Sequence, residues 1–285
     1  DEIFKDAGAE IAADTKSTLE NADLVFKIQR LMTSNDSMNE ISMCKKDSMI
    51  LSHMSALSTK KDSEEYAKAS LTTFAMDLMP RISRAQSMDV LSSQSNLSGY
   101  QAVIKGANNF NSAFPMMMTA AGTVAPAKVF IMGVGVAGLQ AIATAKSMGA
   151  IVTAYDVRAA SKEQVESLGG KFLIVDEDAM KEAETSGGYA KEMTEEYKKK
   201  EQEVIKKHIS DQDIVITTAL IPGRPAPRLV TAEMVKSMRT GTVIVDLAAE
   251  MGGNCELTKR NEVFDADGVK IVGYDNLPGE LPKDA

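Results

Sequence analysis

The sequence predicts an α/β protein made of two domains, each built around a parallel sheet. Short apolar segments that indicate strands alternate with helical segments along the chain, and a repeated β-α-β order implies parallel strands. The chain has 285 residues, which is long for a single core and therefore favours two domains.

The first domain is expected to span residues 1–110. Three apolar runs predict its strands: 22–28, 48–53 and 71–77. A helix is expected over 63–69, where acids in the first turn favour a helix start. Pro80 ends this run because proline cannot continue it. A serine-rich polar stretch follows, and a helix over 100–107 leads to the domain boundary.

The second domain is expected to span residues 111–285. Apolar runs predict six strands: 128–132, 151–155, 172–175, 213–217, 242–245 and 269–273. The first of them has no polar alternation, which is typical of a strand buried on both faces of a parallel sheet. Helices are expected over 136–148 and 161–168. Six strands with intervening helices indicate a doubly wound, Rossmann-like domain.

Composition and charge argue against several classes of function. The net charge of -8 and the pI near 5.0 argue against nucleic acid or an anionic membrane surface as a partner. No apolar run is long enough to span a bilayer. His53 and His208 are the only histidines, and Cys44 and Cys255 the only cysteines. We therefore expect no metal site, no Ser-His-Asp triad and two inert thiols.

A glycine-rich turn follows the strand at 128–132. Gly133, Gly135 and Gly138 have the spacing GxGxxG, which is weak evidence by itself. Here, however, a buried strand precedes the turn, a helix starts within it, and the next strand ends in an acid. Gly133 permits the tight turn, Gly135 lets a pyrophosphate approach the backbone, and Gly138 lets the helix pack close to the strand. The helix N-terminus then offers N–H groups and a positive dipole end to phosphate.

The acid at the end of that second strand is Asp156, 18 residues after Gly138. Its carboxylate can accept hydrogen bonds from the adenosine ribose hydroxyls, and it would repel a 2′-phosphate. Arg158 is the competing signal, because a nearby arginine can accept that phosphate. With the acid present, the sequence predicts NAD(H) rather than NADP(H) as the cofactor.

The sequence offers few groups for acid–base chemistry. Most NAD-dependent dehydrogenases need a base for the proton that accompanies the hydride. His208 ends a charged helix and is expected to face solvent, which leaves His53 as a base and Lys27 as a lysine in an early strand. Hydride exchange between two nicotinamides needs no such base. The polar stretch 81–92 could hold the rings for that reaction.

A second unusual segment covers residues 176–193. It is rich in acids and poor in apolar residues, and it precedes a helix at 194–208 in which Lys and Glu are interleaved. The charge run of that helix indicates a solvated face. The preceding segment is too long for a simple connection, so we expect a mobile lid.

At these motifs the chain resembles a known family. The segment 80–89, PRISRAQSMD, resembles the nicotinamide-binding loop in the NAD(H)-binding component of Re/Si-specific, proton-translocating nicotinamide nucleotide transhydrogenases. The resemblance covers nearly the whole chain and is strongest from residue 77 onward. The other segments that carry it are 119–122, 133–138, 156–158, 217–227, 246–250 and 252–256.

The resemblance implies roles for individual residues. A nicotinamide-side loop at 80–96 would hold the nicotinamide and its ribose through Arg81, Gln86, Asp89 and Ser92. Besides the three glycines of the turn, the residues that would line the pyrophosphate and adenosine end are Val136, Asp156, Val157, Arg158 and Leu220. Gly188 and Tyr189 would belong to the mobile loop that closes over the nucleotide.

The resemblance also implies partners and a location. NAD(H) would bind here, in a cleft flanked by the two parallel sheets, and NADP(H) would bind on a separate component. Hydride would pass directly between them, coupled to proton movement through a membrane component. The chain would form a homodimer and would be a soluble domain of a membrane-associated enzyme, facing the cytoplasm or a mitochondrial-type matrix. By itself it would bind NAD(H) without completing the reaction.

Two other functions stay open. Alanine dehydrogenase shares the two-domain fold and would need a histidine, a lysine and a carboxylate-binding arginine. Lys27 fits that lysine, His53 falls a few positions off, and the arginine region is absent. A non-catalytic NAD-sensing module would not need the nicotinamide-side loop.

The start of the chain departs from the family. We expect the first domain to lack its first βα elements, and residues 52–57 replace an aromatic and proline stretch. The chain starts at Asp1 with neither an initiator methionine nor a signal or transit peptide. Its last residues indicate an interrupted loop. A fragment of a longer polypeptide is therefore expected.

Overall fold

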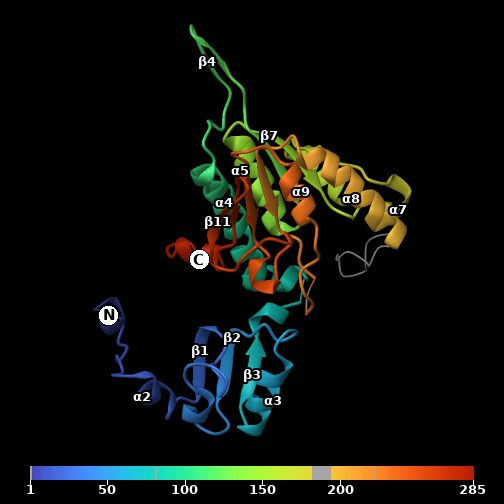
Figure 1. The fold of residues 1–285 in the computed structure, drawn as a ribbon. Helices are drawn as coiled ribbons and strands as arrows, with labels where there is room; N and C mark the ends of the chain where they lie inside the picture. The colour runs from blue at the N-terminus through green and yellow to red at the C-terminus, as the bar shows by residue number, and fades with distance from the viewer. Residues whose placement is uncertain (1, 81, 182–193, 222) are drawn as a thin grey trace. The chain divides into compact units, whose positions relative to one another are not determined.

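The chain divides into two compact units, residues 1–91 and 92–285. The computed structural model describes residues 2–80, 82–181, 194–221 and 223–285 (Figure 1). Each unit is an α/β structure with a parallel sheet, which confirms the fold class predicted from the sequence.

Unit 1 contains a small parallel sheet in the order β1-β2-β3. Its core includes Leu31, Ile50 and Tyr66, and the Tyr66 hydroxyl donates to the carbonyl of Leu31 at 3.0 Å. Burial raises the pKa of Tyr66 to about 12. The elements are α1 Glu2–Asp6, α2 Thr15–Leu19, β1 Leu24–Gln29, η1 Ile41–Met43, β2 Met49–His53, α3 Lys60–Lys68, β3 Thr72–Ala75, η2 Met76–Leu78 and η3 Ser83–Met88.

Unit 2 is built on a larger sheet, seven-stranded within the described residues, in the order β11-β12-β10-β9-β6-β7-β8. Its strands are β6 Lys128–Met132, β7 Ile151–Tyr155, β8 Lys171–Phe172, β9 Ile214–Thr217, β10 Val243–Asp246, β11 Val263–Ala266 and β12 Val269–Val272. Its helices are α4 Val90–Asn109, α5 Val136–Ser147, α6 Ser161–Ser167, α7 Glu177–Lys181, α8 Glu195–Ile209, α9 Ala232–Ser237, η4 Ala249–Met251 and η5 Leu277–Glu280.

The central strand β6 determines where a ligand can bind. β6 pairs in parallel with β7 on one side and with β9 on the other. The chain therefore moves outward in opposite directions from this point, which is the topological switch where α/β sheets bind ligands beyond the carboxyl ends of their strands. The residues of β6 alternate between two cores. In Figure 1, α4 and α5 cover one face of the sheet and α8 and α9 the other.

The edge strand β11 was not predicted from the sequence. It runs antiparallel to β12, and the two are joined at Asp267 and Gly268, which have φ values of 55° and 88°. An Asp-Gly pair with positive φ at both residues is the preferred two-residue hairpin turn. This dipeptide between apolar residues was therefore a readable signal for the strand.

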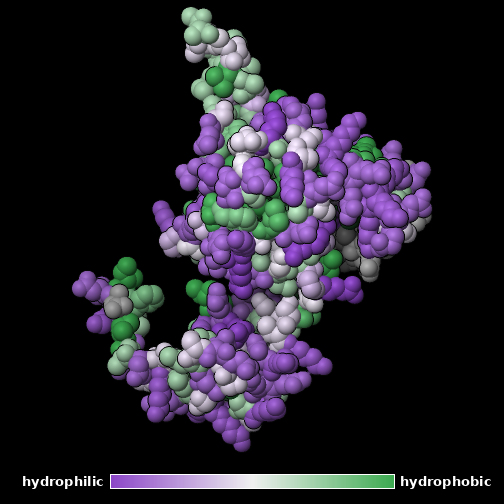
Figure 2. All heavy atoms as spheres, in the orientation of Figure 1, coloured by the Kyte–Doolittle hydropathy of each residue, from purple (hydrophilic) through white to green (hydrophobic). Residues whose placement is uncertain are grey.

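A second unpredicted hairpin projects from unit 2. β4 Met117–Thr119 pairs antiparallel with β5 Gly122–Val124. Both strands are exposed, and Met118 keeps 75% of its surface in solvent. Figure 2 shows the hairpin projecting as a narrow arm with neutral to apolar colouring. Within the described residues, no helix combines the length and apolar character that a membrane crossing requires.

Helix α4 explains why the compact units divide at residue 91, earlier than the boundary expected near residue 110. The sequence indicated this helix only from residue 100, but it begins at Val90 and packs on the sheet of unit 2. Ala102 and Val103 are fully buried in the core of that unit. At Gly99 the helix lies so close to α5 that a Cβ would be 2.0 Å from the carbonyl oxygen of Ala137.

Gly99→Ala is expected to destabilise unit 2 by about 2 kcal/mol, because an added methyl group must displace the backbone of α5. Alanine for glycine in a helix otherwise stabilises by up to about 1 kcal/mol. Chemical denaturation measures the difference. Ser147→Ala, on the exposed face of α5, is the control and should change the free energy of unfolding by less than about 0.5 kcal/mol.

Helix α8 is solvated on one face, as the charge run indicated, but His208 does not face solvent as expected. Its Nε2 hydrogen-bonds the hydroxyl of Thr153 at 2.8 Å, and its ring packs edge-on against Phe130 at 4.7 Å. The sequence position of His208 near Ile205 and Ile209 places it on the buried side of the helix. Burial lowers the pKa of His208, against a smaller opposing effect of Asp211.

The lowered pKa of His208 predicts a pH dependence of stability. Below a pH of about 6.5 the unfolded chain binds the proton more readily than the folded one, so acid favours unfolding. The stability present above that pH should fall as the pH drops toward the folded-state pKa. Thermal melts at about pH 7.5 and about pH 5.5 should show a larger loss for the natural chain than for His208→Gln. Equal losses in the two proteins would contradict this.

Candidate functional site

The glycine-rich turn leaves the carboxyl end of β6. The Gly133 N–H donates to the carbonyl of Tyr155 at 2.8 Å, and the Thr218 hydroxyl donates to the carbonyl of Gly133 at 2.9 Å. Gly133 has a φ of 99°, and a Cβ there would lie 2.7 Å from the Thr218 hydroxyl oxygen. The turn is therefore held from both neighbouring strands, and only glycine fits its first position.

The other two glycines of the turn have different surroundings. A Cβ at Gly138 would lie 1.9 Å from the carbonyl oxygen of Gly133, so this glycine brings α5 against the turn. A Cβ at Gly135 would meet no atom within 4 Å. Gly135 is the N-cap of the twelve-residue helix α5 and has no side chain that could cap it. The open space lies where the helix offers its N–H groups, which fits a pyrophosphate.

Asp156 follows β7 and is only 7% exposed. Its Oδ2 accepts from the Val134 N–H at 2.8 Å, which ties the end of β7 to the turn after β6. Its Oδ1 accepts from the backbone N–H of Arg158 at 2.9 Å. The acid predicted to bind ribose thus also holds the phosphate turn in shape.

Arg158 occupies the remaining acceptor positions of that carboxylate. Its Nε donates to Oδ1 and its Nη2 to Oδ2 of Asp156, both at 2.8 Å. Nη2 also donates to the carbonyl of Val134 at 3.1 Å. A carboxylate has about four acceptor positions, and all are used. The ribose hydroxyls expected to bind Asp156 must therefore replace donors of Arg158, a constraint that the sequence did not indicate.

A buried polar network shapes the loops at the same edge of the sheet. Asp246 accepts from the hydroxyls of Thr217 and Thr258 at 3.0 and 2.6 Å and from the N–H groups of Ala248 and Cys255 at 3.0 Å. It lies at the end of β10 and is 1% exposed. These bonds join the segments 217–227 and 246–258.

Asn254 completes this network. Its Oδ1 accepts from the Ala219 N–H at 3.0 Å, and its Nδ2 donates to the carbonyls of Ala219 and Pro227 at 2.8 Å each. Sequence reasoning gave no role to Thr218, Asp246 or Asn254 individually. The positions of Thr218 and Asp246 at the ends of apolar strands were the available signal, since loops that follow parallel strands form the binding edge.

The other residues predicted at the adenosine end lie beside this edge. Val136 is the first residue of α5, and Val157 follows Asp156 and packs partly against the core. Leu220 follows β9 and is 51% exposed. Together with the turn and Asp156, they come from three neighbouring strands of unit 2. Gly188 and Tyr189 lie outside the described residues.

The residues predicted at the nicotinamide are consecutive turns of one segment. Gln86 is exposed on η3, Asp89 ends that helix, and Ser92 lies in the first turn of α4. Asp89 and Ser92 both have interaction partners. Arg81 lies outside the described residues.

The alternative catalytic groups are not brought together as an alanine dehydrogenase site would require. The Lys27 ammonium donates to Glu40, whose carboxylate is buried and also accepts from the Met32 N–H at 2.7 Å. This lysine is thus held in an ion pair within unit 1. His53 is half-buried at the end of β2. Among the described residues, no three His, Cys, Asp or Glu side chains are grouped to hold a metal ion.

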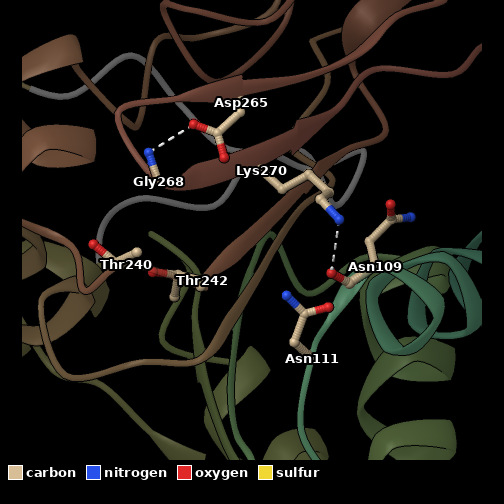
Figure 3. A pocket seen from close by; sticks show the side chains of 8 residues that line it. Asn109, Asn111, Thr240, Thr242, Asp265, Gly268 and Lys270 are labelled. Atoms are coloured by element: carbon tan, nitrogen blue, oxygen red, sulfur yellow. Dashed lines mark hydrogen bonds between the residues drawn. The ribbon is translucent and has the colours of Figure 1, made fainter.

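A small pocket in unit 2 lies away from this edge. Figure 3 shows it between Asn109, Thr242 and Lys270, where Lys270 Nζ donates to the carbonyl of Asn109 at 3.3 Å. It has a volume of about 140 Å³. Thr242 directly precedes β10, so the pocket lies at the amino ends of the parallel strands, opposite the glycine-rich turn. It is therefore no part of the dinucleotide site.

The turn, the switch point and the buried acid define a Rossmann-type dinucleotide-binding domain. Family models describe the chain more narrowly: "Alanine dehydrogenase/PNT, N-terminal domain" matches residues 1–98 and "Alanine dehydrogenase/PNT, C-terminal domain" matches residues 102–285. The chain belongs to the alanine dehydrogenase/PNT family.

Individual relatives place it nearer the transhydrogenases. The chain is 57% identical to an NAD(P) transhydrogenase subunit alpha of Rhodospirillum rubrum, covering 100% of this chain and 74% of the relative. The crystal structure of transhydrogenase from Sinorhizobium meliloti superposes with a TM-score of 0.84 at 48% identity, covering 99% and 75% of the two chains. Alanine dehydrogenase 2 of Staphylococcus aureus is 27% identical, with 98% and 69% covered. The predicted family is confirmed, and alanine dehydrogenase is the more distant relative.

The three glycines should separate folding from binding when each is changed to alanine. Gly133→Ala and Gly138→Ala are expected to lower stability by about 2 kcal/mol or more, because their Cβ atoms overlap backbone or Thr218. Gly135→Ala should fold normally and weaken NADH binding by about tenfold or more. Thermal melts and NADH titrations measure both. Full NADH affinity in a folded Gly135→Ala protein would contradict the placement of the pyrophosphate.

Proposed function

We propose that this chain is the NAD(H)-binding part of a proton-translocating transhydrogenase, and that hydride passes directly between NADH held here and NADP⁺ held by a separate component. The observation that carries the proposal is the phosphate turn, in which Gly135 leaves open space at the N-terminus of α5 beside Asp156. The similarity to the NAD(P) transhydrogenase subunit alpha of Rhodospirillum rubrum supports the same function.

The chain's own contribution to the reaction is binding and orientation. Bound NADH would supply the hydride. The N–H groups at the start of α5 would hold the pyrophosphate, with Val136, Val157 and Leu220 along the adenosine end. Arg81, Gln86, Asp89 and Ser92 would hold the nicotinamide and its ribose. The exposed amide of Gln86 offers both a donor and an acceptor for a nicotinamide carboxamide.

Hydride transfer between nicotinamides fits the described groups better than oxidation of an amino acid. The latter needs a base and a carboxylate receptor. Lys27 already pairs with Glu40, and His53 lies at the end of β2 outside that ion pair. Positioning two rings moves no proton at the reacting carbons, so the scarcity of histidine in this chain is no obstacle.

The partners and location follow from the same proposal. NADP(H) would sit on the partner component, and proton movement would take place in a membrane component. Gly188 and Tyr189 would belong to a loop that closes over the nucleotide. A homodimer is proposed, and the exposed methionines of the β4–β5 hairpin supply apolar surface that association could bury. The chain would face the cytoplasm or a mitochondrial-type matrix.

The chain alone is expected to bind NADH and to reduce no NAD⁺ with alanine. When mixed with an NADP(H)-binding component from a related transhydrogenase, it should transfer hydride from NADH to an NADP⁺ analogue, measured by absorbance. Gln86→Ala should lower the transfer rate by about tenfold or more while leaving the fold unchanged, because it removes a group proposed to orient the nicotinamide.

Three results would count against this function. Alanine-dependent reduction of NAD⁺ would favour the dehydrogenase. Intact NADH binding with no transfer in the presence of an active partner component would favour an NAD-sensing module. Equal transfer rates for the natural chain and Gln86→Ala would remove the nicotinamide-side loop from the site. Lys206→Gln, on the exposed face of α8, is the control and should transfer hydride at the natural rate.

A further inference from the structure

We propose that Asp156 selects NAD(H) by holding the Arg158 guanidinium, and that this guanidinium becomes a receptor for a 2′-phosphate once the carboxylate is removed. The inference rests on the proposed nucleotide site and adds a specificity-determining residue to it. Charge repulsion between Asp156 and a 2′-phosphate is the simpler explanation of selectivity, and the two make different predictions.

The contacts of the pair support the first explanation. Three of the four hydrogen bonds that Asp156 accepts come from Arg158, two of them from its side chain at 2.8 Å. The fourth comes from the Val134 N–H of the phosphate turn. This two-pronged geometry is the one that a guanidinium uses to bind either a carboxylate or a phosphate.

The guanidinium is also in the right place. Its Nη2 donates to the carbonyl of Val134, the residue between the first two glycines of the turn. It therefore lies against the turn and beside the acid that would accept the ribose hydroxyls. A 2′-phosphate attached to that ribose would occupy the position from which Asp156 had been removed. The Arg158 side chain is 19% exposed and the Asp156 side chain 8%, so solvent screens the pair only weakly.

This arrangement gives Asp156 two effects on an incoming nucleotide. Its charge repels a 2′-phosphate, and its hydrogen bonds keep Arg158 from binding one. When NADH binds, ribose hydroxyls can replace some of the Arg158 donors on the same carboxylate, because a hydroxyl is also a donor. A 2′-phosphate brings only acceptors once it is fully ionised and cannot replace them.

The experiment compares NADH and NADPH binding by nucleotide fluorescence in four proteins: the natural chain, Asp156→Asn, Asp156→Asn/Arg158→Gln and Arg158→Gln. Asparagine keeps an oxygen that accepts from the Val134 N–H, so the turn retains its support, but it loses the charge that holds the guanidinium. Asp156→Ser is a second variant in case Asp156→Asn does not fold, which circular dichroism will show. Asp156→Asn/Lys206→Gln controls for loss of a distant positive charge.

The proposal expects Asp156→Asn to bind NADPH at least about tenfold more tightly than the natural chain. The gain should disappear in Asp156→Asn/Arg158→Gln, persist in Asp156→Asn/Lys206→Gln and weaken with added salt more steeply than NADH binding does. Arg158→Gln alone should still exclude NADPH. A purely structural role for the pair would change the affinities for both nucleotides in parallel.

Two results would overturn the proposal. If Asp156→Asn and Asp156→Asn/Arg158→Gln bind NADPH equally, repulsion alone accounts for selectivity. If neither Asp156→Asn nor Asp156→Ser gains affinity for NADPH, Arg158 is no phosphate receptor. Failure of the proposed function is seen separately: a natural chain that binds NADH but transfers no hydride with an active partner component leaves the selectivity result intact. A natural chain that binds neither nucleotide overturns both.

Discussion

The carboxylate of Asp156 is the contact on which the dinucleotide site depends. It joins the end of β7 to the turn that follows β6, and it does so with every acceptor position it has. A buried carboxylate without these donors would carry a large desolvation cost. The paired arginine and the turn amide offset that cost, so the shape of the turn and the charge of the acid depend on each other.

The sheet of unit 2 explains why this contact forms where it does. β6 is buried on both faces, with alternate residues in two separate cores. Its parallel neighbours end at the same edge, so the loops after β6, β7, β9 and β10 converge there. Asp246 and Asn254 bind the later loops together through buried hydrogen bonds. A rigid edge of this kind keeps open space at Gly135 that side chains would otherwise fill.

Much of this architecture was predictable because it rests on local patterns. The six parallel strands of unit 2 follow from apolar runs, and the glycine spacing with its downstream acid locates the turn. The partners of Asp156 were not predictable, since the same Asp-Val-Arg sequence fits an arginine turned toward a phosphate or toward the acid. Only packing decides between these. His208 and α4 differ from expectation for similar reasons: spacing from Ile205 and Ile209 turns the histidine inward, and the serine-rich start of α4 lacks apolar periodicity. The close approach at Gly99 leaves little trace in the local sequence, whereas the Asp267-Gly268 turn was a local signal that could have been used.

The bond between the Thr218 hydroxyl and the carbonyl of Gly133 spans 85 positions of the chain. A turn that looks like a short continuous motif is thus completed by a strand made much later during synthesis. Contacts of such large sequence separation form late, because closing a long loop costs entropy before the contact is gained. A nascent chain that ends before β9 therefore has the glycine motif but not the finished turn. Nucleotide binding then reports on folding of the whole unit rather than on the motif that announces it.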